Sequence, residues 1–264
     1  MDLQVLISTM NQSDYSLLEK MNIHSNALVI NQNRPLRQDF FDFQGNHVEW
    51  YSTPEKGIGN SRNTALLHAK AEVCLFADDD VVYHPEYKIL ILNEFKRLPD
   101  ADVIIFNVGS TNPSRPEYTI DQLKKIHFYN CLRYGTFRIA VRLNRIKTRR
   151  IFFSVLFGGG SKYGSGEDNL FITDCIRKGL QIYGSPIEIG KVTHAESTWF
   201  KGYTKKFFHD KGALFCAISR KFAVPLCLQY CLRHRETLTK LTFLQAFKYM
   251  LGGIHEYENN INQP

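Results

Sequence analysis

The sequence contains no Cys-x-x-Cys pair, no apolar run long enough to cross a membrane and no signal peptide at its start. A spanning helix needs roughly 18 uninterrupted apolar residues, and no stretch reaches that length. The first residues, Met1-Asp2-Leu3-Gln4, lack the basic region that opens a secretory signal. The six cysteines are scattered, so we expect buried free thiols rather than disulfides or a zinc site. These absences favour a globular, cytoplasmic protein.

Acidic residues are missing from one long stretch of the chain. Between Asp121 and Glu167 there is no Asp or Glu, while Lys and Arg accumulate. Residues 1–120 carry 10 Lys/Arg and 16 Asp/Glu, whereas residues 121–264 carry 23 and 10, which gives the net charge of +7. Such a basic half predicts an anionic partner: phosphate, an anionic membrane surface or nucleic acid.

Short apolar segments alternate with helical patterns in the first 110 residues. The segments typical of strands are Leu3–Thr9, Ala27–Asn31, Val48–Ser52, Val73–Ala77 and Asp102–Val108. The helical patterns are Ser13–Met21, Gly57–Lys70 and Pro85–Arg97. This alternation predicts an α/β fold, with a mostly parallel central sheet whose strands are connected by flanking helices.

The remaining residues predict further helices. We expect helix over most of Ile120–Arg150, a strand over Ile151–Phe157, a helix over Asp168–Lys178, and extended chain at Gln181–Tyr183 and Ile187–Val192. From Lys205 the sequence is basic, aromatic and amphipathic, and Pro225 should interrupt its helix. Phe243–Leu251 predicts a last helix. Residues 201–264 therefore form a helical C-terminal extension.

Three consecutive aspartates, Asp78-Asp79-Asp80, follow the apolar segment Val73–Ala77. Carboxylates clustered at the end of a buried strand suffer desolvation and mutual repulsion, and a divalent cation relieves both. Ligands of open α/β sheets bind beyond the carboxyl ends of the strands. Taken alone, the triplet is explained equally well as an acidic turn, because Asp is common in turns.

Two glycine-containing segments accompany the aspartates. Gly57-Ile58-Gly59-Asn60-Ser61-Arg62-Asn63 precedes a predicted helix, where glycines allow close backbone approach and the helix N-terminus favours anions. Gly158-Gly159-Gly160 leads to Glu167-Asp168, at the start of another predicted helix. Alone, a carboxylate at a helix start is more often a cap or a dipole partner than a catalytic group.

Taken in order, these motifs resemble those of family 2 glycosyltransferases with the GT-A (Rossmann-like) fold. The order is Gly-x-Gly-x-x-Arg-Asn, then Asp-Asp-Asp, then Gly-Gly, then Glu-Asp at the start of a helix. The resemblance implies a GT-A domain over residues 1–200. Within it, residues 1–110 would form the nucleotide-sugar-binding half and residues 111–200 the acceptor-side half.

The resemblance implies transfer of a sugar, with inversion, from a nucleotide-diphosphate donor, usually UDP-linked, to a glycan or lipid-linked acceptor. Asp78 and Asp80 match the motif that holds a divalent cation, Mn²⁺ or Mg²⁺, and the donor diphosphate. Asp79 would face the donor ribose or sugar. Asp168 matches the catalytic base, with Glu167 beside it. The other residues that match donor-side positions are Thr9, Asn31, Arg62, Asn63, Gly159 and Gly160.

Two positions need separate comment. Many family members end the second strand with an acidic residue that binds the base, whereas Asn31-Gln32 stands here. Asn31 is still able to hydrogen-bond uracil. His194 matches a position where some members have a metal or diphosphate contact, and a histidine packed in a loop is an equal alternative.

Other protein classes fit parts of the sequence. A nucleotidyltransferase acting on a sugar phosphate would share the metal and the sheet, but residues 8–14 lack the glycine-rich phosphate loop that it needs. No helix-turn-helix, zinc or RNA-binding signature accompanies the basic half, so we expect no nucleic-acid partner. We instead expect the basic aromatic extension to contact an anionic membrane peripherally, on its inner face.

Overall fold

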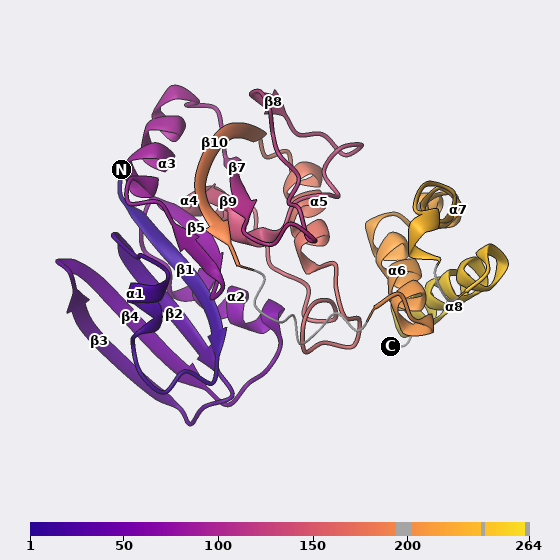
Figure 1. Ribbon diagram of the computed structural model, residues 1–264, viewed down its shortest axis with the longest axis horizontal. Coiled ribbons are helices and arrows are strands. Elements are labelled where there is room, and N and C mark those ends of the chain that lie inside the picture. Colours follow the sequence, from indigo (N-terminus) through magenta and orange to yellow (C-terminus); the bar gives the residue numbers. More distant parts are fainter. Residues whose placement is uncertain (194–201, 239–240, 262–264) are drawn as a thin grey trace.

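The computed structural model describes residues 1–193, 202–238 and 241–261. A mixed sheet, with strand order β3-β4-β2-β1-β5-β9-β7-β10-β6 and β8 paired to β10, lies at its centre. Figure 1 shows helices around this sheet and three C-terminal helices at one end of the molecule. The strands are β1 (Leu3–Met10), β2 (Asn26–Gln32), β3 (Arg37–Phe43), β4 (Asn46–Thr53), β5 (Val73–Asp78), β6 (Val81–Tyr83), β7 (Val103–Ser110), β8 (Lys124–Lys125), β9 (Ile139–Arg142) and β10 (Ile182–Val192).

Helices cover both faces of the sheet. Val5 and Ile7 of β1 belong to one apolar cluster, and Leu6, which points the opposite way, belongs to another. Strands buried on both faces are apolar at successive positions, which is the pattern that predicted them. The helices of this part are α1 (Leu17–Lys20), α2 (Ile58–His68), α3 (Tyr87–Arg97), α4 (Leu143–Thr148) and α5 (Glu167–Arg177).

The α/β fold is confirmed, but the sheet contains more antiparallel pairs than the sequence predicted. β1, β2, β4 and β5 pair in parallel, as expected. The short strand β9 is antiparallel to both of its neighbours, β5 and β7. At one edge of the sheet, β3 is antiparallel to β4.

The predicted helix over Ile120–Arg150 is wrong for most of its length. Only α4 is α-helical there, and the rest is loop, a 3-10 turn at Thr136–Arg138 and the strands β8 and β9. Arg138 gives the reason. Its buried side chain donates hydrogen bonds to the carbonyls of Phe106 and Tyr118, both 2.9 Å, which hold this segment against the sheet.

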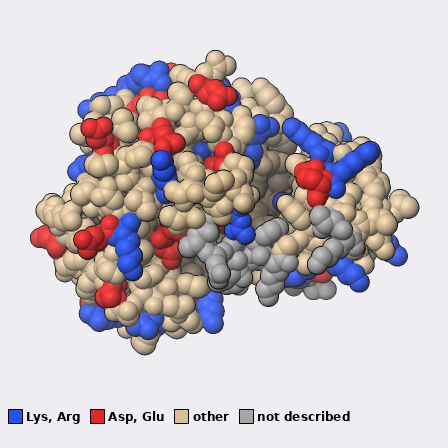
Figure 2. All heavy atoms as spheres, viewed as in Figure 1, with Lys and Arg blue, Asp and Glu red and all other residues tan. Residues whose placement is uncertain are grey.

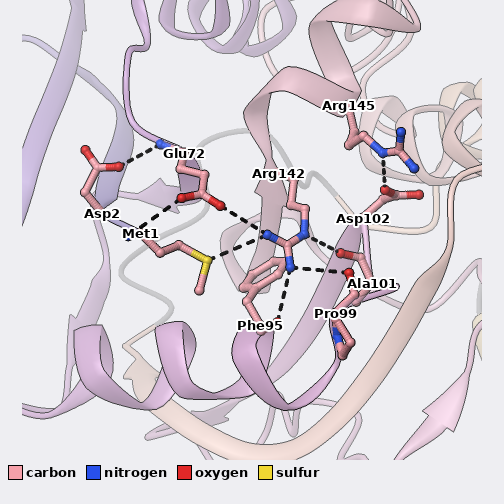
Figure 3. Close-up of polar contacts among 9 residues, drawn as sticks. All are labelled: Met1, Asp2, Glu72, Phe95, Pro99, Ala101, Asp102, Arg142 and Arg145. Carbon is pink, nitrogen blue, oxygen red and sulfur yellow. Dashed lines mark hydrogen bonds and ion pairs between the residues drawn. The ribbon is translucent and has the colours of Figure 1, made fainter.

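Two arginines form polar contacts at the end of the sheet that lies opposite the aspartate triplet (Figure 3). Arg142 ends β9 beside the first residue of β5 and donates to the carbonyls of Ala101 (2.9 Å) and Phe95 (3.2 Å). Arg145 pairs with Asp102 at 2.6 Å. These two members of the basic segment therefore have a structural function.

The C-terminal extension is helical, as predicted, and consists of α6 (Lys205–Ile218), α7 (Ala223–Arg233) and α8 (Phe243–Ile261). Pro225 lies in the first turn of α7, so the interruption comes just before it, at residues 219–222. The apolar cluster of these helices includes Phe157, Tyr163 and Leu170 from the sheet domain. Within the described residues, no helix is both long enough and apolar enough to cross a bilayer.

Candidate active site

The carboxyl ends of three neighbouring parallel strands form one edge of the sheet. Thr9 of β1 pairs with Asn31 of β2, and Ser8 of β1 pairs with Asp78 of β5. The Ser61 hydroxyl of α2 donates to the Ser8 hydroxyl at 2.8 Å, which fixes the first turn of α2 against this edge. Thr9, Asn31, Asp78 and the start of the Gly57–Asn63 segment therefore meet where open α/β sheets bind ligands.

The three aspartates have different surroundings. Asp79 accepts a hydrogen bond from the Thr9 hydroxyl at 2.6 Å. Burial raises the pKa of Asp79 above its usual range, although that hydrogen bond opposes the change. Burial, together with the charges of Asp78 and Asp79, raises the pKa of Asp80 to about 6. The nearby cations of the protein do not fully offset the negative charge of these carboxylates. Such a setting favours a bound cation.

Arg62 joins the aspartate triplet to the Glu-Asp motif. Its Nη2 donates to Asp78 Oδ1 at 2.7 Å and its Nη1 donates to Glu167 Oε1 at 2.8 Å. Arg62 is buried, and its Nε has no hydrogen-bond partner among the described residues. Two acidic motifs that are distant in sequence therefore lie on either side of one guanidinium.

A backbone hydrogen bond connects the two glycine segments. The Ile58 amide donates to the Gly159 carbonyl at 3.0 Å. A side chain at Gly59 would collide with the Ser154 carbonyl, so only glycine permits this approach. The side-chain nitrogen of Asn63 donates to the Phe153 carbonyl (2.9 Å), and its side-chain oxygen accepts from the Phe153 backbone N–H (2.7 Å). Residues 151–157 were predicted to form a strand, and this prediction is wrong. The Asn63 side chain, rather than a neighbouring strand, hydrogen-bonds the backbone of Phe153.

Glu167 begins α5 directly over Gly158. A Cβ at Gly158, whose φ is 103°, would lie 2.7 Å from Glu167 Oε2. The same carboxylate accepts the Gly166 amide at 3.2 Å. Glycine at 158 therefore leaves the space in which Glu167 reaches Arg62.

Asp168 follows Glu167 and has a strongly altered acidity. Burial, followed by the neighbouring Glu167 charge, raises the pKa of Asp168 to about 7. The carboxylate accepts hydrogen bonds from the Asn169 amide (2.7 Å) and side chain (2.8 Å). A carboxylate with a pKa near 7 is matched to general-base catalysis at neutral pH.

Lys211 of α6 is a functional candidate that the sequence did not reveal. Its pKa is lowered by burial, while its attraction to Asp168 opposes that shift. The ammonium lies 5.5 Å from the Phe207 ring centre and 5.7 Å from that of Tyr230. One residue earlier, Asp210 accepts the Gly164 amide at 2.9 Å, so α6 is attached to the loop that leads to Asp168. Nothing in the local sequence signals this, because only the fold brings α6 to α5.

Comparison with protein families matches residues 33–158, a little under half of the chain, to the model described as "Glycosyl transferase family 2". The matched segment is therefore similar to family 2 glycosyltransferases. The match includes Arg62, Asn63 and the aspartate triplet, and it ends before Glu167 and Asp168. Comparison with curated proteins finds no match.

Solved structures show the same GT-A-like fold. This chain is similar to S. aureus TarS 1-349, with a TM-score of 0.63 and 14% identity, over 100% of this chain and 90% of that one. It is also similar to TarS 1-349 in complex with UDP-GlcNAc (TM-score 0.62, 14% identity, 100% and 91% covered). For the complex of TarS 1-349 with UDP, the TM-score is 0.58 at 14% identity, over 100% and 92% of the two chains.

The other predicted site residues of this chain have varied positions. Asn31 is buried, and its side chain exchanges two hydrogen bonds of 3.0 Å with the Gln12 backbone, so it holds the loop after β1. Gly160 follows Gly159 with a φ of 80°. His194 lies outside the described residues. Roles in donor binding for these residues stay predictions.

Proposed function

We propose that this chain is a family 2 glycosyltransferase, which moves a sugar from a nucleotide-diphosphate donor, UDP-linked, to a hydroxyl of a glycan or lipid-linked acceptor, with inversion. The observation that carries this proposal is the double ion pair of Arg62 with Asp78 and Glu167. It joins the edge expected to hold the donor to the carboxylate expected to act as base. The UDP-GlcNAc and UDP complexes of the similar TarS structures support the choice of donor class.

In the proposed reaction Asp168 accepts the proton of the acceptor hydroxyl. The acceptor oxygen forms its bond to the anomeric carbon as the bond from that carbon to the diphosphate oxygen breaks, and the nucleoside diphosphate leaves with the electron pair. The donor would lie along Thr9, Asn31, Arg62, Asn63, Asp78, Asp79, Gly159 and Gly160. A positioned carboxylate base contributes on the order of 10²–10⁴ in rate.

The residues at this edge fit a hard divalent cation, Mn²⁺ or Mg²⁺. Among the described residues, no three His, Cys, Asp or Glu side chains are placed to hold a metal ion by themselves. Mg²⁺ sites in proteins commonly use only one or two carboxylates, together with substrate phosphates. Asp80 and Asp78, with His194 as a further candidate, would hold the ion. When bound, it neutralises charge on the leaving diphosphate.

Sugar transfer should depend on both acidic motifs. We expect Asp168→Asn to lower kcat by about 10²–10⁴ with little change in UDP affinity, because only the proton acceptor is lost. Asp80→Ala should abolish the dependence of transfer on Mn²⁺. The measurement is release of UDP from UDP-sugars, screened with glycan and lipid-linked acceptors.

Asp174→Asn is the matched control, because Asp174 lies on the same helix with an exposed side chain that pairs with Arg177. It should retain normal turnover. Wild-type turnover in both Asp168→Asn and Asp80→Ala would refute the proposed function.

A lipid-linked acceptor would be met at a membrane, and we propose peripheral contact with the anionic inner face of the cell membrane. The supporting observation is the uneven charge of the chain, with its excess of Lys and Arg after residue 120. Basic clusters bind anionic lipid surfaces electrostatically.

A further inference from the structure

The outward face of α7 is apolar. Val224, Leu228 and Leu232, four residues apart, are 47%, 43% and 50% exposed. Residues at this spacing lie on one side of a helix. The adjoining side carries Cys227 and Cys231, which are fully buried in the cluster shared with α6 and α8. This helix is therefore apolar on its solvent face as well as on its packed face.

Neighbouring residues enlarge this face. Phe222, directly before α7, is 54% exposed, and Pro225 is also exposed. Gln229 is the only polar residue among the exposed positions from 224 to 232. Helices on the surface of water-soluble proteins normally present polar residues outward. Contiguous exposed apolar residues instead indicate an interaction site.

Positive charges lie at both ends of the apolar face. Arg220 and Lys221 precede it, Arg233 and Arg235 follow it, and all four are exposed. Within residues 211–240 Glu236 is the only acid, and it lies 3.2 Å from the His234 ring nitrogen. Figure 2 shows several Lys and Arg side chains, with an acidic group among them, in the region of the three C-terminal helices where α7 lies. The partner of this face should accordingly combine an apolar interior with negative charge.

We propose that the α7 face, defined as Phe222, Val224, Pro225, Leu228 and Leu232 with their flanking Lys and Arg, docks on an anionic lipid bilayer. Its apolar side chains would enter the boundary between headgroups and acyl chains, while the cations would contact the headgroups. A second copy of the chain is a poorer partner. In a two-fold contact the face would meet itself, and like charges would be brought together.

The docking surface also has a defined relation to the active site. α6 packs against α7 on one side, and through Asp210 it holds the loop before Asp168 on the other. An α7 bound to a bilayer would therefore hold the active-site loop near the surface where a lipid-linked acceptor is found. This inference deepens the proposed function, and it rests on that function only for the identity of the acceptor.

Vesicle flotation of the full chain, without donor, tests the docking. We expect recovery with vesicles of phosphatidylcholine plus phosphatidylglycerol, and little recovery with phosphatidylcholine alone. Leu228→Gln/Leu232→Gln should lower the partition coefficient about tenfold or more, because two apolar side chains that would enter the bilayer are lost. Arg233→Gln/Arg235→Gln should lower it about 10–30-fold, at roughly 1 kcal/mol for each charge.

Leu244→Gln is the control, because Leu244 is 76% exposed on α8, outside the α7 face, and this variant should float normally. All five substituted positions are exposed, so the variants should keep the wild-type Tm. Equal recovery on both kinds of vesicle, or normal flotation of the folded Leu228→Gln/Leu232→Gln variant, would overturn the proposal. So would a wild-type dimer that this pair of substitutions dissociates, since a second copy would then cover α7. Normal flotation without any sugar transfer would count against the proposed function alone.

Discussion

Asp168 and Lys211, both half-buried, bring opposite charges from different parts of the chain into one region. The pKa of Asp168, raised to about 7 by burial and then by Glu167, is held down in part by Arg62 and Lys211. Lys211→Met removes a positive charge, so the pKa of Asp168 should rise above 7. Since the base acts only when deprotonated, the acidic limb of the kcat–pH profile should move to higher pH. We expect lower activity at pH 7 and recovery at more alkaline pH, measured as UDP release across the pH range.

Two substitutions separate this electrostatic effect from a packing effect. Lys211→Arg keeps the charge and should leave the acidic limb close to its wild-type position. Lys205→Met removes an exposed charge from the same helix, beside Tyr249 rather than Asp168, and should leave it unchanged. A uniform fall in kcat at every pH in Lys211→Met, with no displacement of the limb, would show that Lys211 only supports the packing of α6.

At the scale of helices, α6 and α8 approach so closely that their backbones touch. A Cβ at Gly212 of α6 would overlap the Met250 carbonyl, and one at Gly253 of α8 would overlap the His209 carbonyl. Gly253→Ala should therefore force the helices apart and lower the free energy of unfolding by about 1–3 kcal/mol. Urea denaturation followed by circular dichroism measures this.

The adjacent glycine supplies the control for that prediction. A Cβ at Gly252 would have His209 Cδ2 as its nearest atom, at an ordinary contact distance of 3.7 Å. Gly252→Ala should be neutral or stabilising by up to about 1 kcal/mol, because alanine favours helix. If the two variants unfold at the same urea concentration, the close packing of α6 on α8 is not what limits stability.

The sequence predicted the elements that are buried on both faces, and it missed those held by single side chains. β1, β2 and β5 have continuous apolar patterns with clear ends, α2 was predicted as a helix opened by glycines, and the structure confirms all four. β3 is an edge strand in which Arg37, Asp39 and Asp42 interrupt the apolar residues, so it gave no strand pattern. The segment around Arg138 looked helical by spacing, whereas hydrogen bonds from its guanidinium to distant carbonyls decide its path.

The site shows the same division. Asp78, Asp79, Asp80, Glu167 and Asp168 were predicted as candidates because their motifs are contiguous in the sequence. The link that Arg62 makes between them, and the approach of Lys211, depend on tertiary contacts that no local pattern encodes.

At the scale of the whole molecule, the C-terminal helices and the sheet domain share one apolar cluster, in which Phe157 and Tyr163 of the glycine loop stack together. Tyr163 also donates to Glu256 of α8 at 3.2 Å. A ligand bound at the site should therefore stabilise the sheet domain and the extension together. We expect UDP with Mn²⁺, at about 100 times its Kd, to add about 2.7 kcal/mol and to raise Tm by roughly 5–10 °C in a single transition.

Calorimetry in three conditions tests this coupling and the metal together. UDP with a chelator should give a much smaller shift than UDP with Mn²⁺, because the diphosphate charge would remain next to Asp78 and Asp80. Asp80→Ala should lose most of the difference between those two conditions, while Asp174→Asn should retain it. Two separate transitions, of which UDP moves only one, would show that the extension unfolds independently of the site. Equal shifts with and without Mn²⁺ would instead show that UDP binds here without a cation.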